Sequence, residues 1–180
     1  MPTVPVALMT VEEYRRIPEP VGPYSYELHQ GELVKVSRPK ARHYRLQMQL
    51  LKPLEAVAPP GSLVGIEFPF RPLPEHELRV ADVAYVSPSR WQQVDPEDNL
   101  HGAPELVIEV LSPSNTAAEI LAKEQICLEN GCLEFWVVDD QRRQVRVTTA
   151  DGRVTIYKPG QSIPLTVLGG GELSVDSIFG

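Results

Sequence analysis

Residues 104–114 have the sequence Pro104-Glu105-Leu106-Val107-Ile108-Glu109-Val110-Leu111-Ser112-Pro113-Ser114. The middle of this stretch is apolar and β-branched, has the length of a strand, and is bounded by a proline on each side. A run that is apolar on both faces predicts a strand buried in the middle of a sheet. Glu109 interrupts this run, and a buried carboxylate is costly unless a cation or strong donors meet it. Glu109 therefore either caps the strand and pairs with an arginine, or belongs to a functional site.

A second isolated acid favours the functional site. Asp82 lies at the centre of another short apolar strand, Arg79–Ser87, although Asp is among the poorest strand formers. Two acids in two buried strands of one small domain indicate a site for a hard cation, because Mg²⁺ takes carboxylate oxygens as ligands. The helix that follows Ser114 carries Lys123 on the same face as Ile120 and Cys127. This lysine either snorkels from the edge of an apolar stripe or reaches the two carboxylates.

This order of acid, acid and lysine resembles the PD-(D/E)XK, or restriction-endonuclease-like, superfamily of nucleases. More closely, the chain is similar to the Uma-type family of small bacterial endonuclease-like proteins. The resemblance extends from about Met9 to about Tyr157, and the string Glu-Val-Leu-Ser-Pro-Ser at 109–114 is a fairly specific part of it. The matching stretches are Tyr26–Leu28 with Gly31–Val34, Val80–Pro88, Pro104–Ser114, Lys123, Asn130-Gly131 and Glu134–Asp139.

The resemblance implies a Mg²⁺- or Mn²⁺-dependent endonuclease that hydrolyses DNA phosphodiester bonds. In that interpretation Asp82 and Glu109 hold the metal, and they form the catalytic set together with Lys123. The usual proline before the aspartate is Ala81 here, and the lysine usually found two residues after the glutamate is replaced by Leu111. The family moves the function of this lysine to the following helix, where Lys123 stands. Further candidates for the site are Glu27 and Glu32, in the hairpin motif of the family, and His43.

The predicted fold is a single α/β domain over residues 1–180, with a restriction-endonuclease-like core. A central mixed sheet contains the Asp82, Glu109 and Trp136 strands, and helices over about 41–57 and 116–130 flank it. One β-hairpin precedes this core around residues 29–31, and another follows it around residues 150–153. A composition of 42% hydrophobic and 23% charged residues indicates an ordinary globular protein. Cys127 and Cys132 have no metal-ligand cluster around them, which predicts buried free thiols.

The charges of the chain give two opposed indications about whether it binds nucleic acid. The net charge is −7, whereas nucleic-acid-binding proteins usually have a basic surface. Locally, however, the segment between Leu33 and Gln47 holds five cations and no acid. It is either a solvated loop and helix start or a rim that contacts phosphates. The proposed DNA-binding residues are Lys35, Arg38, Lys40, Arg42 and Arg45, and His43 lies among them.

Two other functions stay open at the level of sequence. The chain could be a nuclease-like nucleic-acid-binding or assembly module without turnover, which Leu111 and the acidic balance both favour, or a metal-dependent hydrolase of another phosphate ester. The chain has no apolar run of transmembrane length and no signal-peptide pattern. We therefore expect a cytoplasmic protein without a membrane partner. If it forms a homo-oligomer, we expect a dimer.

Overall fold

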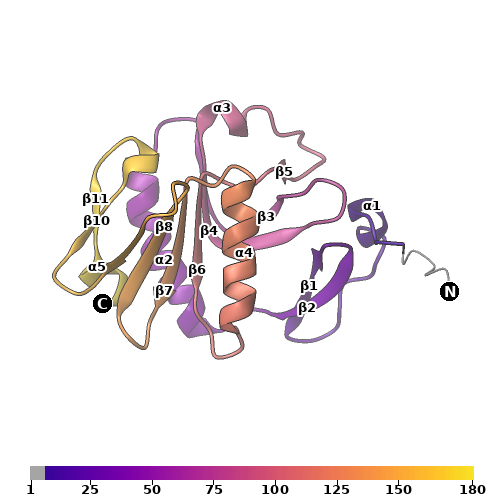
Figure 1. Ribbon diagram of the computed structural model, residues 1–180, viewed down its shortest axis with the longest axis horizontal. Coiled ribbons are helices and arrows are strands. Elements are labelled where there is room, and N and C mark those ends of the chain that lie inside the picture. The colour runs from indigo at the N-terminus through magenta and orange to yellow at the C-terminus, as the bar shows by residue number, and fades with distance from the viewer. Residues whose placement is uncertain (1–6) are drawn as a thin grey trace.

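A seven-stranded mixed sheet forms the centre of the computed structural model, which describes residues 7–180 (Figure 1). The strand order is β5-β3-β4-β6-β7-β8-β9. β6 is parallel to β7 and β3 is parallel to β5, while the other neighbours are antiparallel. This arrangement confirms the predicted α/β class and mixed sheet. The strands are β3 (Leu63–Arg71), β4 (Arg79–Val86), β5 (Leu100–His101), β6 (Leu106–Val110), β7 (Glu134–Asp139), β8 (Gln144–Thr149) and β9 (Val154–Tyr157).

Two long helices, α2 and α4, cover the two faces of this sheet (Figure 1). Leu50 of α2 shares one hydrophobic core with Ile108, and Cys127 of α4 shares another with Val107. Because consecutive strand residues point to opposite faces, the central strand β6 is buried from both sides, as its apolar run predicts. The helices are α1 (Val11–Tyr14), α2 (Ala41–Val57), α3 (Pro88–Trp91), α4 (Ala117–Glu129) and α5 (Val175–Phe179), with the short 3₁₀ helix η1 (Thr166–Leu168).

The boundaries of α4 follow from local chemistry. The Thr116 side chain accepts a hydrogen bond from the Glu119 amide, and the Glu119 carboxylate accepts one from the Thr116 amide. This capping box fixes the start of the helix immediately after the β6 strand and its turn. Gly131, with φ of +107°, ends the helix in a conformation that favours glycine. The register of α4 that results places Lys123 on its buried face.

Two small antiparallel sheets lie beside the central one. β1 (Tyr24–His29) and β2 (Glu32–Ser37) form the N-terminal hairpin, which packs with α1 around a small core of Val11, Leu28 and Leu78. β10 (Ser162–Pro164) pairs with β11 (Glu172–Ser174) near the C-terminus. The second predicted hairpin, β8 with β9, extends the central sheet at one edge. The hairpin β1–β2 is not a part of the central sheet, but an isolated β-bridge between Leu28 and Leu78 attaches it just before β4.

The alternation of side chains reverses halfway along β3 and β4. Ile66 and Val83 pack in the core on the α2 side, whereas Phe68 and Ala81, two residues away from them along their strands, pack on the α4 side. Pairing runs in one register on both sides of the reversal, so Glu67 stands opposite Asp82. Glu67 has φ of +48°. The left-handed conformation of Glu67 therefore coincides with the reversal, and Asp82 lies at the same level of the neighbouring strand.

Both cysteines, Cys127 and Cys132, are buried and free, as predicted. Within residues 7–180, no helix combines the length and the apolar character that crossing a bilayer requires.

Candidate active site

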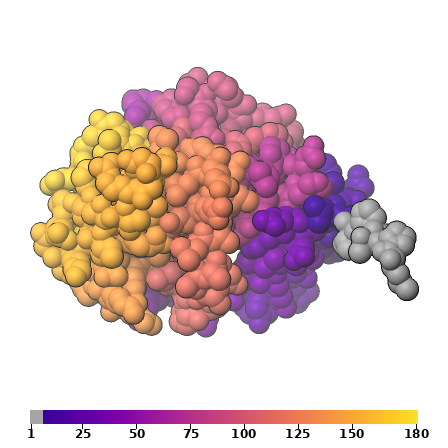
Figure 2. All heavy atoms as spheres, in the orientation of Figure 1, coloured from indigo at the N-terminus to yellow at the C-terminus, as the bar shows by residue number. Residues whose placement is uncertain are grey.

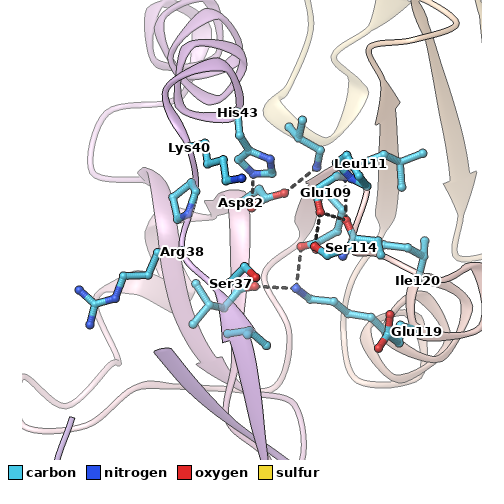
Figure 3. A pocket seen from close by; sticks show the side chains of 18 of the residues that line it. Ser37, Arg38, Lys40, His43, Asp82, Glu109, Leu111, Ser114, Glu119 and Ile120 are labelled. Carbon is cyan, nitrogen blue, oxygen red and sulfur yellow. Dashed lines mark hydrogen bonds and ion pairs between the residues drawn. The ribbon is translucent and has the colours of Figure 1, made fainter. Parts of the chain in front are cut away.

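An open cleft of about 750 Å³ lies between the hairpin β1–β2 and the central sheet. The start of α2, the loop 111–115 and the turn 139–142 complete its walls. Figure 3 shows Lys40 and His43 from the first of these segments and Leu111 and Ser114 from the second. Figure 2 shows the purple surface of the hairpin beside the salmon surface that surrounds the start of α4. Asp82, Glu109 and Lys123 all line this cleft, so the structure brings together the three residues of the predicted catalytic set.

Three donors around the carboxylate hold Asp82 in place. The Val110 amide donates to Asp82 Oδ2 at 2.6 Å, and Gln47 Nε2 donates to Asp82 Oδ1 at 3.1 Å. His43 Nε2 lies 2.9 Å from the same Oδ1, and a dashed line marks this contact in Figure 3. The Val110 contact connects β4 to β6 directly beside Glu109. The orientation of Asp82 is therefore fixed by both the neighbouring strand and α2.

Glu109 and Lys123 form a buried ion pair. Lys123 Nζ lies 2.8 Å from Glu109 Oε1, and both side chains are about nine-tenths buried. The ammonium group donates a hydrogen bond to the Val80 carbonyl at 2.6 Å. Oε1 has no hydrogen-bond partner within residues 7–180, so the ion pair with Lys123 is what compensates its burial. A cation at Glu109 would therefore bind Oε2 or compete with Lys123 for Oε1.

Burial and charge shape the protonation of this pair. Burial raises the pKa of Glu109, and although Lys123 opposes the shift, Asp82 reinforces it. Burial alone would lower the pKa of Lys123, but the negative charges of Glu109, Glu27 and Asp82 outweigh burial and raise it. Lys123 therefore stays charged inside the cleft and faces acids from β1, β4 and β6.

The hairpin contributes its own charged residues to the cleft. Burial would raise the pKa of Glu27, but Lys123, His29 and Arg79 outweigh it and the pKa is lowered. His29 Nε2 lies 2.7 Å from Glu27 Oε2. Glu27 thus lines the cleft, whereas Glu32, on the neighbouring strand, is exposed and does not.

Four of the five cations in the proposed rim line the cleft. Arg38 pairs with Glu19, and Arg42 pairs with Asp140 across the mouth of the cleft. Lys35 lies 3.9 Å from the centre of the Tyr24 ring. The cations that line the cleft are Lys35, Arg38, Lys40 and Arg42; Arg45 is exposed on α2 and does not line it.

Sequence reasoning missed two residues of the site, Glu67 and Gln47. One possible ligand atom from each of His43, Glu67 and Asp82 lies within 4.8 Å of the others. Gln47 is fully buried and also donates to Glu67 Oε1. A signal for Glu67 exists in the sequence, because it is an isolated acid in the apolar run Leu63–Phe70, just as Asp82 and Glu109 are in theirs. Gln47 carries no comparable signal.

Comparison with known proteins agrees with this architecture. The family model described as "Uma2: Putative restriction endonuclease" matches residues 11–176. The crystal structure of a putative nuclease belonging to DUF820 from Anabaena variabilis ATCC 29413 superposes with a TM-score of 0.79. It covers 95% of this chain and 97% of that chain at 20% sequence identity, which shows that the fold is shared. No sequence among the curated proteins matches this chain.

Proposed function

The chain belongs to the Uma2 family of putative restriction endonucleases, and on that basis we propose that it is a Mg²⁺-dependent endonuclease that hydrolyses DNA phosphodiester bonds. The observation that carries the proposal is the convergence of Asp82, Glu109 and Lys123 in one cleft with a basic rim. Two acids and a lysine beside a rim of cations are groups that metal-dependent hydrolysis of a phosphodiester uses.

The donor set fits a hard divalent cation. Asp82 and Glu109 offer carboxylate oxygens, the ligands that Mg²⁺ prefers. Glu109 Oε1 is buried 2.8 Å from Lys123 Nζ, so a cation would be held by Oε2 or would share Oε1 with the ammonium group. When bound there, Mg²⁺ would acidify a water molecule and offset charge on the phosphate.

The residues of the chain itself would bind and orient the substrate. The ammonium group of Lys123, fixed between Glu109 and the Val80 carbonyl, would neutralise charge that develops on a phosphate oxygen. Lys35 and Lys40 would contact neighbouring backbone phosphates from the rim. Gln47 and the Val110 amide keep Asp82 aimed into the cleft, so no reorientation of this carboxylate is needed during the reaction.

The substitution Lys123→Met tests this proposal. Methionine keeps the bulk of the stem and removes the charge, and Glu109, whose pKa burial raises, can take up a proton in place of its lost partner, so the fold should survive with reduced stability. Cleavage of plasmid DNA in Mg²⁺ or Mn²⁺ should fall about 100-fold or more, the usual loss when one preorganised charge-stabilising group is removed. Lys52→Met is the matched control, because Lys52 is exposed on α2 and lies outside the cleft. Equal cleavage by wild type and Lys123→Met would assign Lys123 a structural role only.

Binding without turnover is the second candidate function. Leu111, at the usual position of the superfamily lysine, packs against the core on the α4 side, so that position offers no charge to the cleft. A protein of this kind would shift DNA in a gel mobility assay and leave plasmid DNA intact in both Mg²⁺ and Mn²⁺. DNA cleavage that is lost in Lys123→Met would exclude binding without turnover.

A further inference from the structure

One edge of the central sheet, the outer side of β9, is open. β9 pairs with β8 on its inner side, and within residues 7–180 no strand pairs with its outer side. Proteins protect such edges with lysine, proline, a bulge or a very short strand. The opposite edge follows this rule, because β5 has only two residues. β9 has the sequence Val-Thr-Ile-Tyr and a regular register with β8, and it carries none of these protective features.

The backbone groups of Val154 and Ile156 point away from the sheet. The Thr149 amide donates to the Arg153 carbonyl at 3.0 Å, so these two residues form a hydrogen-bonded pair at the end of the β8–β9 ladder. Such pairs alternate with non-hydrogen-bonded pairs in an antiparallel ladder, and the register therefore places Thr155 in the next hydrogen-bonded position. The N–H and C=O groups of Val154 and Ile156 are directed outward, where they offer two donors and two acceptors to an added strand.

The side chains of the same two residues make this edge apolar on one face. Ile156 stands opposite Arg146 of β8, and Arg146 pairs with Glu124 of α4, so this is the α4 side of the sheet. Val154, two residues before Ile156, lies on the same face. Val154 is 53% exposed and Ile156 is 46% exposed. The partner that fits this edge is therefore an extended strand with an apolar face.

β9 itself is such a strand, and its sequence is complementary to itself. If two copies pair antiparallel about a twofold axis at Thr155, Val154 of each copy stands opposite Ile156 of the other. Four apolar side chains then form one cluster on the α4 side. On the other face, Arg153 stands opposite Tyr157 of the second copy, and a guanidinium group is attracted to an aromatic ring. Each charged residue at the ends of β9 faces an uncharged one, so no like charges meet.

We propose that the protein forms a homodimer in which two copies of β9 pair antiparallel about a twofold axis at Thr155. The interface is isologous, with the same strand on both sides, and it joins the two seven-stranded sheets into one. The pairing uses every outward N–H and C=O group of Val154 and Ile156. No residue of β9 lines the cleft, so the dimer leaves both clefts open. Dimer formation is therefore independent of the proposed function.

The substitution Thr155→Cys tests the register of this pairing. In the dimer the two copies of residue 155 form a non-hydrogen-bonded pair with Cα atoms about 4.5 Å apart, a separation that a disulfide spans. Oxidised glutathione should convert Thr155→Cys into a linked dimer on non-reducing gels. Arg153→Cys is the matched control, because its two copies lie about 13 Å apart along the strands and should stay unlinked. Wild type should also stay unlinked, because Cys127 and Cys132 are buried.

Analytical ultracentrifugation tests the association itself. Wild type should sediment as a dimer that dissociates on dilution. Ile156→Pro removes an outward N–H and no bond to β8, which an edge strand tolerates, and should raise the dissociation constant at least about ten-fold because the dimer loses two hydrogen bonds.

A second variant and a control separate the open edge from other surfaces. Ile156→Lys places a charge on the edge and should also weaken the dimer, whereas Leu73→Lys, at an apolar residue that is 42% exposed in a loop, should not. A monomeric wild type overturns the proposal. So does a dimer that both variants at Ile156 leave intact, or equal cross-linking of Thr155→Cys and Arg153→Cys.

Discussion

At the scale of single residues, the site is defined by the hydrogen bonds and ion pairs that its acids make. Asp82 accepts from the Val110 amide and from Gln47, so its carboxylate is locked in one orientation before any ligand arrives. Glu109 has an ion pair with Lys123 and an oxygen without a hydrogen bond from residues 7–180. A carboxylate has about four acceptor sites, so the donors around Asp82 fix its orientation and still leave room for a ligand. The charge of Glu109, on the adjacent strand, is compensated by Lys123.

A second buried pair, Arg79 with Glu77, supports the wall of the cleft. Arg79 Nε donates to Glu77 Oε2 at 2.7 Å, and the Glu77 side chain is 0% exposed. Arg79→Met would leave this carboxylate buried without its cation, so we expect a loss of about 3–5 kcal/mol in the free energy of unfolding. Urea denaturation measures it, and adding Glu77→Gln should recover part of the loss.

The exposed pair of Arg153 and Asp151 provides the control for that experiment. Its side chains are 73% and 64% exposed, and pairs of this kind contribute about 0–1 kcal/mol. If Arg79→Met costs no more than Arg153→Met, then the Glu77 carboxylate is solvated or protonated in the variant, and burial of the pair is not what holds this wall.

Isolated acids within apolar strands were the strongest signal in the sequence. That signal identified Asp82 and Glu109, and the structure places both in one cleft. Applied to the third such strand it would also have identified Glu67. Gln47 could not be found in this way, because a glutamine in a helix is unremarkable until its neighbours across the sheet are known. Identifying Lys123 as a site residue required both the helical register of α4 and the resemblance to a family.

At the scale of elements, helices were predictable and strand faces were not. The capping box of Thr116 and Glu119 and the stop at Gly131 define α4 from sequence alone. The reversal of side-chain alternation at Glu67 has no such local cause, since a glutamate at positive φ is disfavoured. The surrounding sheet and α2 impose it. Tertiary contacts therefore decided which way Asp82 points.

The structure shows what anchors the long polar segment 87–103. Asp98 Oδ1 accepts from Arg71 of β3 at 2.8 Å and also from Arg15, which follows α1. Its Oδ2 lies 2.8 Å from His101 Nε2. Burial alone would raise the pKa of Asp98, but hydrogen bonds from Arg71, Asn99 and Arg15 outweigh burial and hold the pKa well below its usual value of 3.8. One carboxylate therefore ties three elements together.

A lowered pKa makes this anchor sensitive to acid. The stabilisation is complete above the unfolded-state pKa, about 3.9, and is lost as the pH falls from there towards the lower folded-state pKa. Asp98→Asn should cost about 1.5–3 kcal/mol near pH 7, because it weakens charge-assisted hydrogen bonds. Its unfolding free energy should then fall less steeply than that of wild type below about pH 4. Parallel pH slopes for the two proteins in urea denaturation would show that Asp98 is not the titrating anchor.

At the scale of the whole molecule, the acidic net charge and the basic rim make opposite contributions to DNA binding. A net charge of −7 repels DNA at long range, while Lys35, Arg38 and Lys40 are concentrated at the mouth of the cleft. Such a distribution favours binding only where the phosphates meet the rim. Affinity should therefore depend steeply on salt and on a few residues.

The role of the basic rim in DNA binding can be tested by comparing its lysines with Arg45, a cation of the same segment. The logarithm of the DNA affinity should fall linearly with the logarithm of salt concentration, and replacing Lys35 and Lys40 by alanine should reduce the slope by about two units, roughly 0.9 per lost phosphate contact. Arg45→Ala is the matched control, because Arg45 belongs to the same basic run but lies outside the cleft. Fluorescence anisotropy in Ca²⁺, which supports binding at carboxylate sites, measures the slopes. Equal slopes for wild type and the double variant would place Lys35 and Lys40 on a solvated surface. If Arg45→Ala reduced the salt slope as much as the double variant does, DNA would lie along α2 and not in the cleft.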